Sequence, residues 1–202
     1  MNRKIKILFF IETIDGGGAE KVLRNLVNNM DQQKFDITVQ TVFPDGGAAL
    51  LVPGIRYRAM YAARTRFTEL LYRLEAELGL AYPLRMKDTY DIECACLECG
   101  ATKVLAGSTN PKAVKLAWVH CDLQKAMKDP AAFAVKTKKY YQRYDRVVCV
   151  SELGQQSFRE LYGDEIQTVI VRNTVDCEEI LQNAEKPVSD LPKSPLVVSL
   201  GR

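Results

Sequence analysis

The stretch that decides the fold is residues 5–30, IKILFFIETIDGGGAEKVLRNLVNNM. It begins with an apolar run that ends at Glu12, and this run predicts a buried strand. The three glycines at positions 16–18 predict a tight turn. From Ala19 to Met30, apolar residues recur at helical spacing with polar residues on the other face. The stretch is therefore predicted to form a strand, a turn and a helix, the unit from which parallel sheets are built.

The same alternation continues along the chain. Further apolar runs predict strands at residues 35–43, 55–61, 90–97, 114–120, 146–151 and 167–172. Helices are predicted at residues 67–78, where Phe67 and four leucines recur at helical spacing, and at 101–106, 131–144 and 152–162. Strands interleaved with helices predict an α/β fold with a Rossmann-like, doubly wound, mainly parallel sheet that is covered on both faces.

The last part of the chain predicts a domain boundary. A short helix is expected after Asp176, and the three prolines that follow it are typical of a linker. The final run, LVVSLGR at residues 196–202, predicts the first buried strand of another parallel sheet. We therefore expect an amino-terminal Rossmann-like domain at 1–176, an interdomain linker at 177–195, and at 196–202 the first strand of a second domain that this chain lacks.

Composition limits the class of protein. The chain has 202 residues, of which 47% are hydrophobic and 26% charged, as in soluble globular proteins. A net charge of +3 is too small to indicate a nucleic-acid partner, which needs a clustered basic surface. The apolar run at residues 7–11 is too short for a membrane span or a signal peptide. We therefore expect a cytoplasmic protein that does not bind nucleic acid.

Three of the six cysteines form the pattern Cys94-x-Cys96-x-x-Cys99. Cys-x-x-Cys is a common spacing of zinc ligands. In a strand, however, Cys94 and Cys96 lie on one face, where they serve as small apolar residues. No second cysteine pair or histidine pair completes a set of four ligands, so we expect no metal site.

The glycine turn at Gly16, Gly17 and Gly18 is a candidate site for an anion. It joins the first predicted strand to the first predicted helix, where backbone N–H groups and the helix dipole favour a phosphate. The alternative is a tight turn that only packs the helix on the strand. A dinucleotide-binding fingerprint is disfavoured, because Lys21 replaces its last glycine and residues 41–43 end the second strand without an acidic residue.

The single histidine, His120, is the candidate catalytic residue. It lies at the end of the predicted strand at 114–120, so it should emerge at the same edge of the sheet as the glycine turn. An imidazole can exchange a proton or hydrogen-bond a sugar or a phosphate near neutral pH. The alternative is a structural histidine. Cys121 is adjacent in sequence, but such adjacency does not make a Cys-His dyad.

Five segments in this order resemble the retaining nucleotide-sugar glycosyltransferases of the GT-B fold, family 4, also called group 1. They are Gly16-Gly17-Gly18-Ala19-Glu20, Trp118-Val119-His120, Val148-Cys149-Val150-Ser151, Val171-Arg172-Asn173-Thr174-Val175-Asp176 and Ser199-Leu200-Gly201-Arg202. The resemblance runs over nearly the whole chain. It departs from the family in that the lysine after Gly-Arg and the Glu-rich donor motif are absent from this chain.

The resemblance implies the amino-terminal, acceptor-side half of a two-domain enzyme. Its matched positions imply that Gly16, Gly17, Gly18 and Arg202 bind the donor diphosphate and that His120 lies beside the transferred sugar. Asp122, Ser151 and Asn173 would line the cleft or the acceptor site. The nucleotide-sugar is a substrate, and the family needs no cofactor and no metal. Because the second domain lies outside this chain, we expect little or no transfer by residues 1–202 alone.

The resemblance also implies the partners. They are a nucleotide-sugar donor and a saccharide or lipid-linked acceptor, in the synthesis of a surface polysaccharide or glycolipid. The segment at 136–144 is basic and contains tyrosines, and it has two interpretations. It is either a solvated helix face or a surface that contacts the cytoplasmic, inner face of an anionic membrane peripherally. The second function left open is a stand-alone Rossmann-like module that binds a phosphorylated ligand or partner without catalysis.

Overall fold

The computed structural model describes residues 3–187. The predicted strand at 196–202, with Arg202, lies outside the described residues, as does the part of the predicted linker beyond residue 187. The boundary expected at residue 176 therefore stays a prediction.

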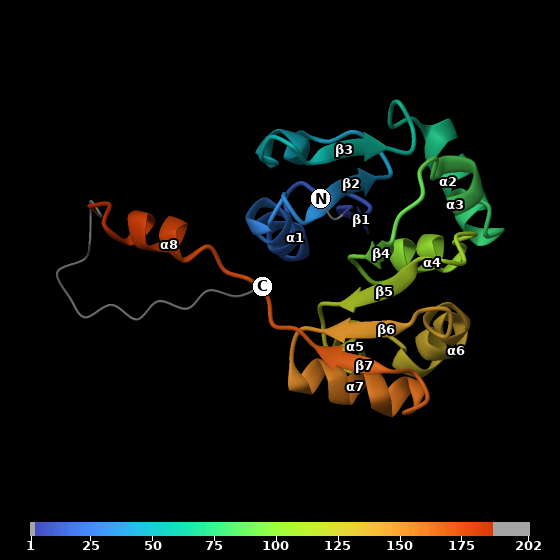
Figure 1. Ribbon diagram of the computed structural model, residues 1–202. Coiled ribbons are helices and arrows are strands. Elements are labelled where there is room, and N and C mark those ends of the chain that lie inside the picture. Colours follow the sequence, from blue (N-terminus) through green and yellow to red (C-terminus); the bar gives the residue numbers. More distant parts are fainter. Residues whose placement is uncertain (1–2, 188–202) are drawn as a thin grey trace.

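The described residues form one parallel sheet of seven strands in the order β3-β2-β1-β4-β5-β6-β7 (Figure 1). The strands are β1 (Ile5–Phe10), β2 (Phe35–Thr41), β3 (Arg56–Ala59), β4 (Ile92–Ala95), β5 (Val114–Val119), β6 (Arg146–Cys149) and β7 (Thr168–Ile170). Every neighbouring pair is parallel. The seven strands predicted between residues 5 and 172 and the predicted Rossmann-like sheet are confirmed.

Helices connect these strands. They are α1 (Gly18–Asn29), α2 (Arg66–Glu77), α3 (Ala81–Arg85), α4 (Gly100–Ala106), α5 (Leu123–Ala126), α6 (Pro130–Tyr141), α7 (Glu152–Tyr162), α8 (Cys177–Ala184) and the 3-10 helix η1 (Gly46–Leu50). The sequence did not predict α3, α5 or η1. Pro83 is the third residue of α3, a position at which a backbone N–H has no partner within the helix.

Hydrophobic cores lie on both faces of the sheet. Along β1, Leu8 and Phe10 belong to one core, while Ile7 and Phe9 belong to the other. Successive side chains of a strand point to opposite faces, so a strand that is buried on both sides needs a continuous apolar run. The first core receives side chains of α4, α6 and α7, and the second receives Leu23 and Val27 of α1. The prediction of a doubly covered sheet is thus confirmed.

The cysteine pattern divides between core and surface. Cys94 and Cys96 are buried in the second core, which confirms that they serve as apolar residues. Cys99 is exposed at the start of α4 and has a left-handed backbone, with φ of 67°. Within residues 3–187, no group of three or more His, Cys, Asp or Glu side chains could hold a metal ion.

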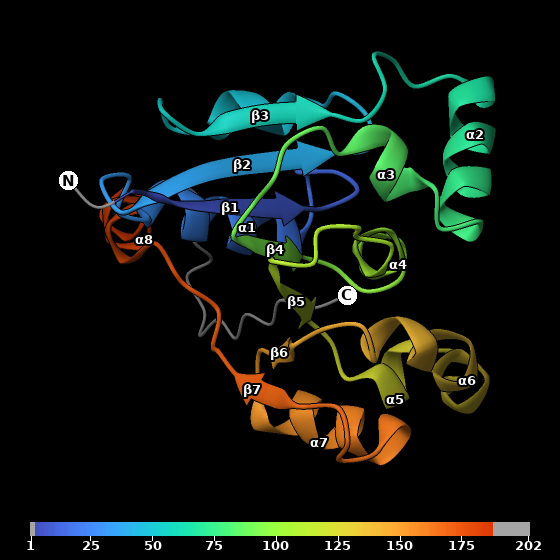
Figure 2. The ribbon, with the colours of Figure 1, turned by 45° about the vertical axis from the view of Figure 1, so that its right-hand side comes forward.

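Two helices lie at the periphery. In both views α2 lies at the outer edge of the molecule (Figures 1 and 2). Helix α8 stands away from the sheet in Figure 1 and has no buried side chain. Among the helices of the described part of the chain, none has the length and apolar character that a membrane crossing requires.

Candidate functional site

The candidate site lies where the strand order reverses. From β1 the chain moves outward to β2 and β3, whereas from β4 it moves the other way to β7. In open α/β sheets, ligands bind in the crevice at the carboxyl ends of the strands on either side of such a reversal. Here the residues after β1 and after β4 flank that crevice, and the residues after β5 lie beside them.

The glycine turn enters the crevice from β1. Gly16 has φ of +95°, a conformation that glycine adopts at little cost. Gly17 is the N-cap of α1, and a Cβ added to Gly16 or Gly18 would meet no atom within 4 Å. Glycine at position 17 supplies no capping oxygen, so the first N–H groups of this twelve-residue helix are available to an acceptor. The carboxylate of Glu20 currently lies against Gly17.

His120 follows β5 and is partly buried. Its ring stacks on Trp118, with centroids 5.8 Å apart and an interplanar angle of 14°. Burial lowers the pKa of His120 below its ordinary value, while the carboxylates of Glu98 and Glu20 act in the opposite direction. The imidazole is therefore neutral at pH 7. His120 follows β5 and the glycine turn follows β1, and these parallel strands end at the same edge of the sheet, as the sequence predicted.

Glu98 holds the backbone that carries His120. Its Oε1 accepts hydrogen bonds from the backbone N–H of His120 at 2.5 Å and of Cys121 at 3.2 Å. The side chain is buried, and it joins the segment after β4 to the segment after β5. The sequence analysis did not identify Glu98 as a site residue, because Glu98 lies within the cysteine pattern that was considered only as a possible metal site.

Glu12 is a second carboxylate that the sequence analysis missed. It follows β1, and its Oε1 accepts a hydrogen bond from the Tyr72 hydroxyl of α2 at 2.9 Å. Burial raises the pKa of Glu12 above its ordinary value, although the bond from Tyr72 partly opposes this. A Cβ at position 100 would overlap the Glu12 carboxylate, so Gly100 is needed for the close approach of α4. The only signal in the sequence was that Glu12 ends an apolar run.

A cavity of about 570 Å³ opens beside Glu12, between α2, α4 and α6. Its apolar wall includes Tyr72, Phe133 and Tyr140. Its charged residues are Arg73, Lys103, Lys136, Lys139, Glu12 and Glu77. Four cations against two carboxylates, next to aromatic rings, suit a molecule with both an anionic group and an apolar part.

Of the remaining predicted site residues within the described part of the chain, Asp122 and Ser151 cap helices, and Asn173 lies exposed after β7. Asp122 caps α5 by accepting from the Gln124 N–H at 3.1 Å, and a hydrogen bond with Ser157 is the main reason that the pKa of Asp122 is lowered. Ser151 caps α7 by accepting from the Gly154 N–H at 3.1 Å. Asn173 is exposed after β7. Their roles in a cleft stay predictions.

The geometry defines a class: a Rossmann-like domain with a candidate ligand site at the carboxyl edge of its sheet. The chain belongs to Glycosyltransferase Family 4, whose family model matches residues 16–179. This match confirms the resemblance that the motifs carried.

Two solved structures share the fold. The chain is similar to Anabaena Alr3699/HepE in complex with UDP-glucose, with a TM-score of 0.61, 18% identity, and coverage of 85% of this chain and 44% of that one. It is also similar to the same protein in complex with UDP and glucose, with a TM-score of 0.58, 17% identity, and coverage of 90% and 50%. The chain thus spans about half the length of these proteins or less. No curated protein matches it.

Proposed function

We propose that the chain supplies the acceptor-side domain of a retaining glycosyltransferase. The enzyme moves a sugar from a nucleotide-sugar to a saccharide or lipid-linked acceptor, in the synthesis of a surface polysaccharide or glycolipid. The observation that carries the proposal is that the glycine turn after β1 and His120 after β5 both lie at the carboxyl edge of the sheet, beside the point where the strand order reverses. Family membership supports it, and so does the bound UDP-glucose of Alr3699/HepE.

The glycine turn and His120 have separate roles in this proposal. The diphosphate of the donor takes the place that the Glu20 carboxylate now has at the start of α1, where N–H groups stabilise the charge of the leaving group. The neutral imidazole of His120 donates or accepts a hydrogen bond at the transferred sugar. Further contacts to the diphosphate come from Arg202 and a second Rossmann-like domain. No cofactor and no metal take part.

The cavity beside Glu12 is the proposed acceptor pocket. Lys103, Lys136 and Lys139 provide positive charge for a phosphate group, and the aromatic wall packs against an apolar chain or a sugar face. Asp122, Ser151 and Asn173 line the remainder of the cleft. A lipid-linked acceptor requires a cytoplasmic enzyme that contacts the inner face of a membrane peripherally.

A transfer assay with the complete gene product tests this function. The protein is screened against a panel of sugar nucleotides with saccharide and lipid-phosphate acceptors. We expect His120→Ala to reduce transfer by about 100-fold or more while the unfolding midpoint is kept. Leu153→Ala, on the exposed face of α7, is the control and keeps full activity. Turnover of His120→Ala at the wild-type rate would refute the role of His120, and binding of phosphorylated ligands without any turnover would favour the non-catalytic module.

A further inference from the structure

The acceptor pocket leads into a further cavity on each side. One cavity, of about 290 Å³, shares Glu12, Tyr72 and Arg73 with the acceptor pocket. The other, of about 380 Å³, shares Lys103 and Lys139 with it and has no lining residue in common with the first. The acceptor pocket therefore has two ends, which we call the carboxylate end, at Glu12, and the lysine end, at Lys103 and Lys139.

Charge distinguishes the two ends. The cavity at the carboxylate end is lined by two arginines and two glutamates, so its charges balance when all four are ionised. The cavity at the lysine end is lined by Lys103, Lys139 and Arg143 against Glu77 alone. Positive charge is therefore in excess at the lysine end, and an anionic group is attracted there.

Glu12 is a carboxylate without a cation. Within residues 3–187, the one hydrogen bond of its side chain is the bond that Oε1 accepts from Tyr72. Buried Glu75, by contrast, has both the Tyr61 hydroxyl and Arg85 as partners. A carboxylate that has lost water in a cavity is stabilised by hydrogen-bond donors, and each of its two oxygens accepts more than one. Glu12 thus has acceptor capacity for a donor on a ligand.

The carboxylate end is the end nearer the candidate catalytic residues. The Glu12 carboxylate packs against Gly100, the first residue of α4. Two residues earlier in the chain, Glu98 holds the backbone of His120. Lys103 lies about one turn further along α4. A group that Glu12 binds therefore lies beside the segment that positions His120.

Helix α2 presents a polar side to the pocket. Tyr72 reaches Glu12, and on the same side of the helix Glu75 is buried and accepts a hydrogen bond from Arg85 Nε at 2.9 Å. Leu70 and Leu74 are exposed instead, although a surface helix ordinarily buries its leucines. Breaking a buried ion pair is strongly destabilising, so these polar contacts fix the orientation of α2 and keep Tyr72 on Glu12.

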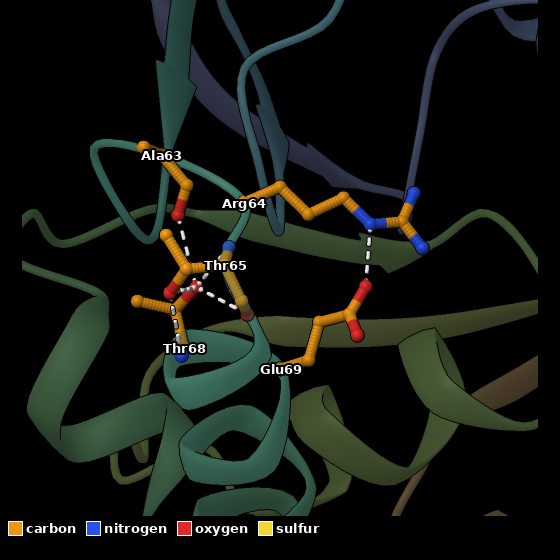
Figure 3. A network of polar contacts seen from close by, with 5 residues as sticks. All are labelled: Ala63, Arg64, Thr65, Thr68 and Glu69. Atoms are coloured by element: carbon orange, nitrogen blue, oxygen red, sulfur yellow. Dashed lines mark hydrogen bonds and ion pairs between the residues drawn. The ribbon is translucent and has the colours of Figure 1, made fainter.

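The start of α2 fixes the wall of the cavity at the carboxylate end (Figure 3). Arg64 and Glu69 both line this cavity, and Arg64 Nε donates to Glu69 at 2.6 Å. Thr65 and Thr68 form a reciprocal capping box, in which each hydroxyl accepts from the backbone N–H of the other residue, at 3.1 Å and 2.9 Å. Such caps stabilise a helix end. The carboxylate end is therefore formed before a ligand binds.

We propose that the acceptor is a glycosyl phosphate that binds with its sugar at the carboxylate end, where Glu12 accepts a hydrogen bond from a sugar hydroxyl, and with its phosphate at the lysine end. This rests on the proposed function, because it specifies the acceptor of that reaction. A hydroxyl makes a strong hydrogen bond to a carboxylate, and a lysine does so to a phosphate. The reverse orientation would bring the phosphate to the uncompensated carboxylate of Glu12, which repels it. Glu12 is thus a residue that determines acceptor specificity.

Isothermal titration calorimetry of the 202-residue chain tests this orientation with three kinds of octyl ligand. The full ligands are octyl phosphodiesters of glucose, galactose and N-acetylglucosamine. Methyl octyl phosphate has the same charge but lacks the sugar, and the octyl glycosides of the same sugars lack the phosphate. For the wild type, we expect at least one full ligand to bind about tenfold or more tightly than methyl octyl phosphate and than its own octyl glycoside.

Two single variants should separate the ends. Glu12→Gln removes the charge and keeps an oxygen for the Tyr72 hydroxyl, so we expect an unchanged unfolding midpoint. It should weaken binding of the full ligand and of its octyl glycoside by about fivefold or more, without weakening methyl octyl phosphate. Lys139→Gln should weaken the two phosphate-bearing ligands and not the octyl glycoside. Glu77→Gln is the matched control, because it makes the same chemical change at the lysine end and should not weaken the octyl glycoside.

Other results would overturn the proposal. These are a wild type that binds no full ligand more tightly than methyl octyl phosphate, and a Glu12→Gln protein that binds the full ligand as the wild type does. Equal losses of all three kinds of ligand in Glu12→Gln and Lys139→Gln would also overturn it, and so would the reversed pattern of losses. Binding needs neither a donor nor a second domain, so its failure is distinct from the absence of turnover in the transfer assay.

Discussion

Glu98 offers a sharp test of how the candidate site is positioned. Its carboxylate is buried and receives the backbone N–H groups of His120 and Cys121. Glu98→Gln keeps the shape of the side chain and one acceptor oxygen but removes the charge. A hydrogen bond to a charged acceptor contributes about 1.5–3 kcal/mol, compared with about 0.5–1.5 kcal/mol for a neutral one. With two bonds affected, we expect the free energy of unfolding to fall by about 2 kcal/mol.

The same substitution should also shift the titration of His120. Burial already lowers the pKa of His120 below 6.5, and the Glu98 carboxylate is the main charge that opposes this shift. Glu98→Gln should therefore lower the pKa of His120 further. Because the folded-state pKa lies below the unfolded value, the contribution of His120 to stability is complete above pH 6.5 and is lost as the pH falls toward the folded-state pKa. The variant should lose more stability in this range than the wild type.

Proton NMR measures this shift without an assignment problem, because His120 is the only histidine in the chain. The imidazole resonance is followed from pH 8 to pH 4, a range that includes the ordinary histidine pKa of about 6.5 and extends further below it. Urea unfolding of both proteins gives the change in stability. Glu20→Gln is the control, since Glu20 raises the pKa of His120 less than Glu98 does. A Glu98→Gln protein with an unchanged His120 pKa and unchanged stability would refute the positioning role.

Three further predictions concern the fold around the site. Phe158→Ala removes a fully buried ring whose centroid lies 4.4 Å from that of the Tyr162 ring. Urea unfolding should show that the free energy of unfolding falls by about 3–5 kcal/mol. Gly16→Ala should cost about 1–2 kcal/mol in the same assay because of its positive φ, whereas Gly18→Ala, in the helix and without a steric contact, should be neutral or slightly stabilising. Glu75→Gln leaves Arg85 without its charged partner, so the variant should have a lower free energy of unfolding than the wild type at neutral pH. Because Arg85 lowers the pKa of Glu75, this difference in the free energy of unfolding should disappear as the pH falls below 4.5.

The strands were predictable because a parallel sheet leaves a direct trace in the sequence. Each central strand is buried on both faces and needs a continuous apolar run, as in β1. Helix α7 was predicted at its observed bounds, since Ser151 caps it and Gly163, with φ of +88°, ends it. Helices α3 and α5 were not predicted. They have five and four residues, too few to show a helical period.

The candidate site was predictable only in part. The glycine turn and His120 were placed at one edge because both follow parallel strands, and parallel strands end at the same edge. Glu12 and Glu98 were missed because their importance depends on partners far away in sequence, Tyr72 for one and the backbone of His120 for the other. A carboxylate after a strand has no distinctive pattern until its partner is known.

The sequence by itself determined the alternation of strands with the longer helices, the doubly covered sheet and the edge of the sheet at which the candidate site residues lie. These follow from local periodicity and from the parallel connection of strand to strand, which short-range patterns encode. Only the tertiary structure decided which face of α2 points outward. The leucine pattern of α2 is the same whether it faces the core or solvent, and its orientation depends on Glu75, Arg85 and Tyr61, which the fold brings together from three segments.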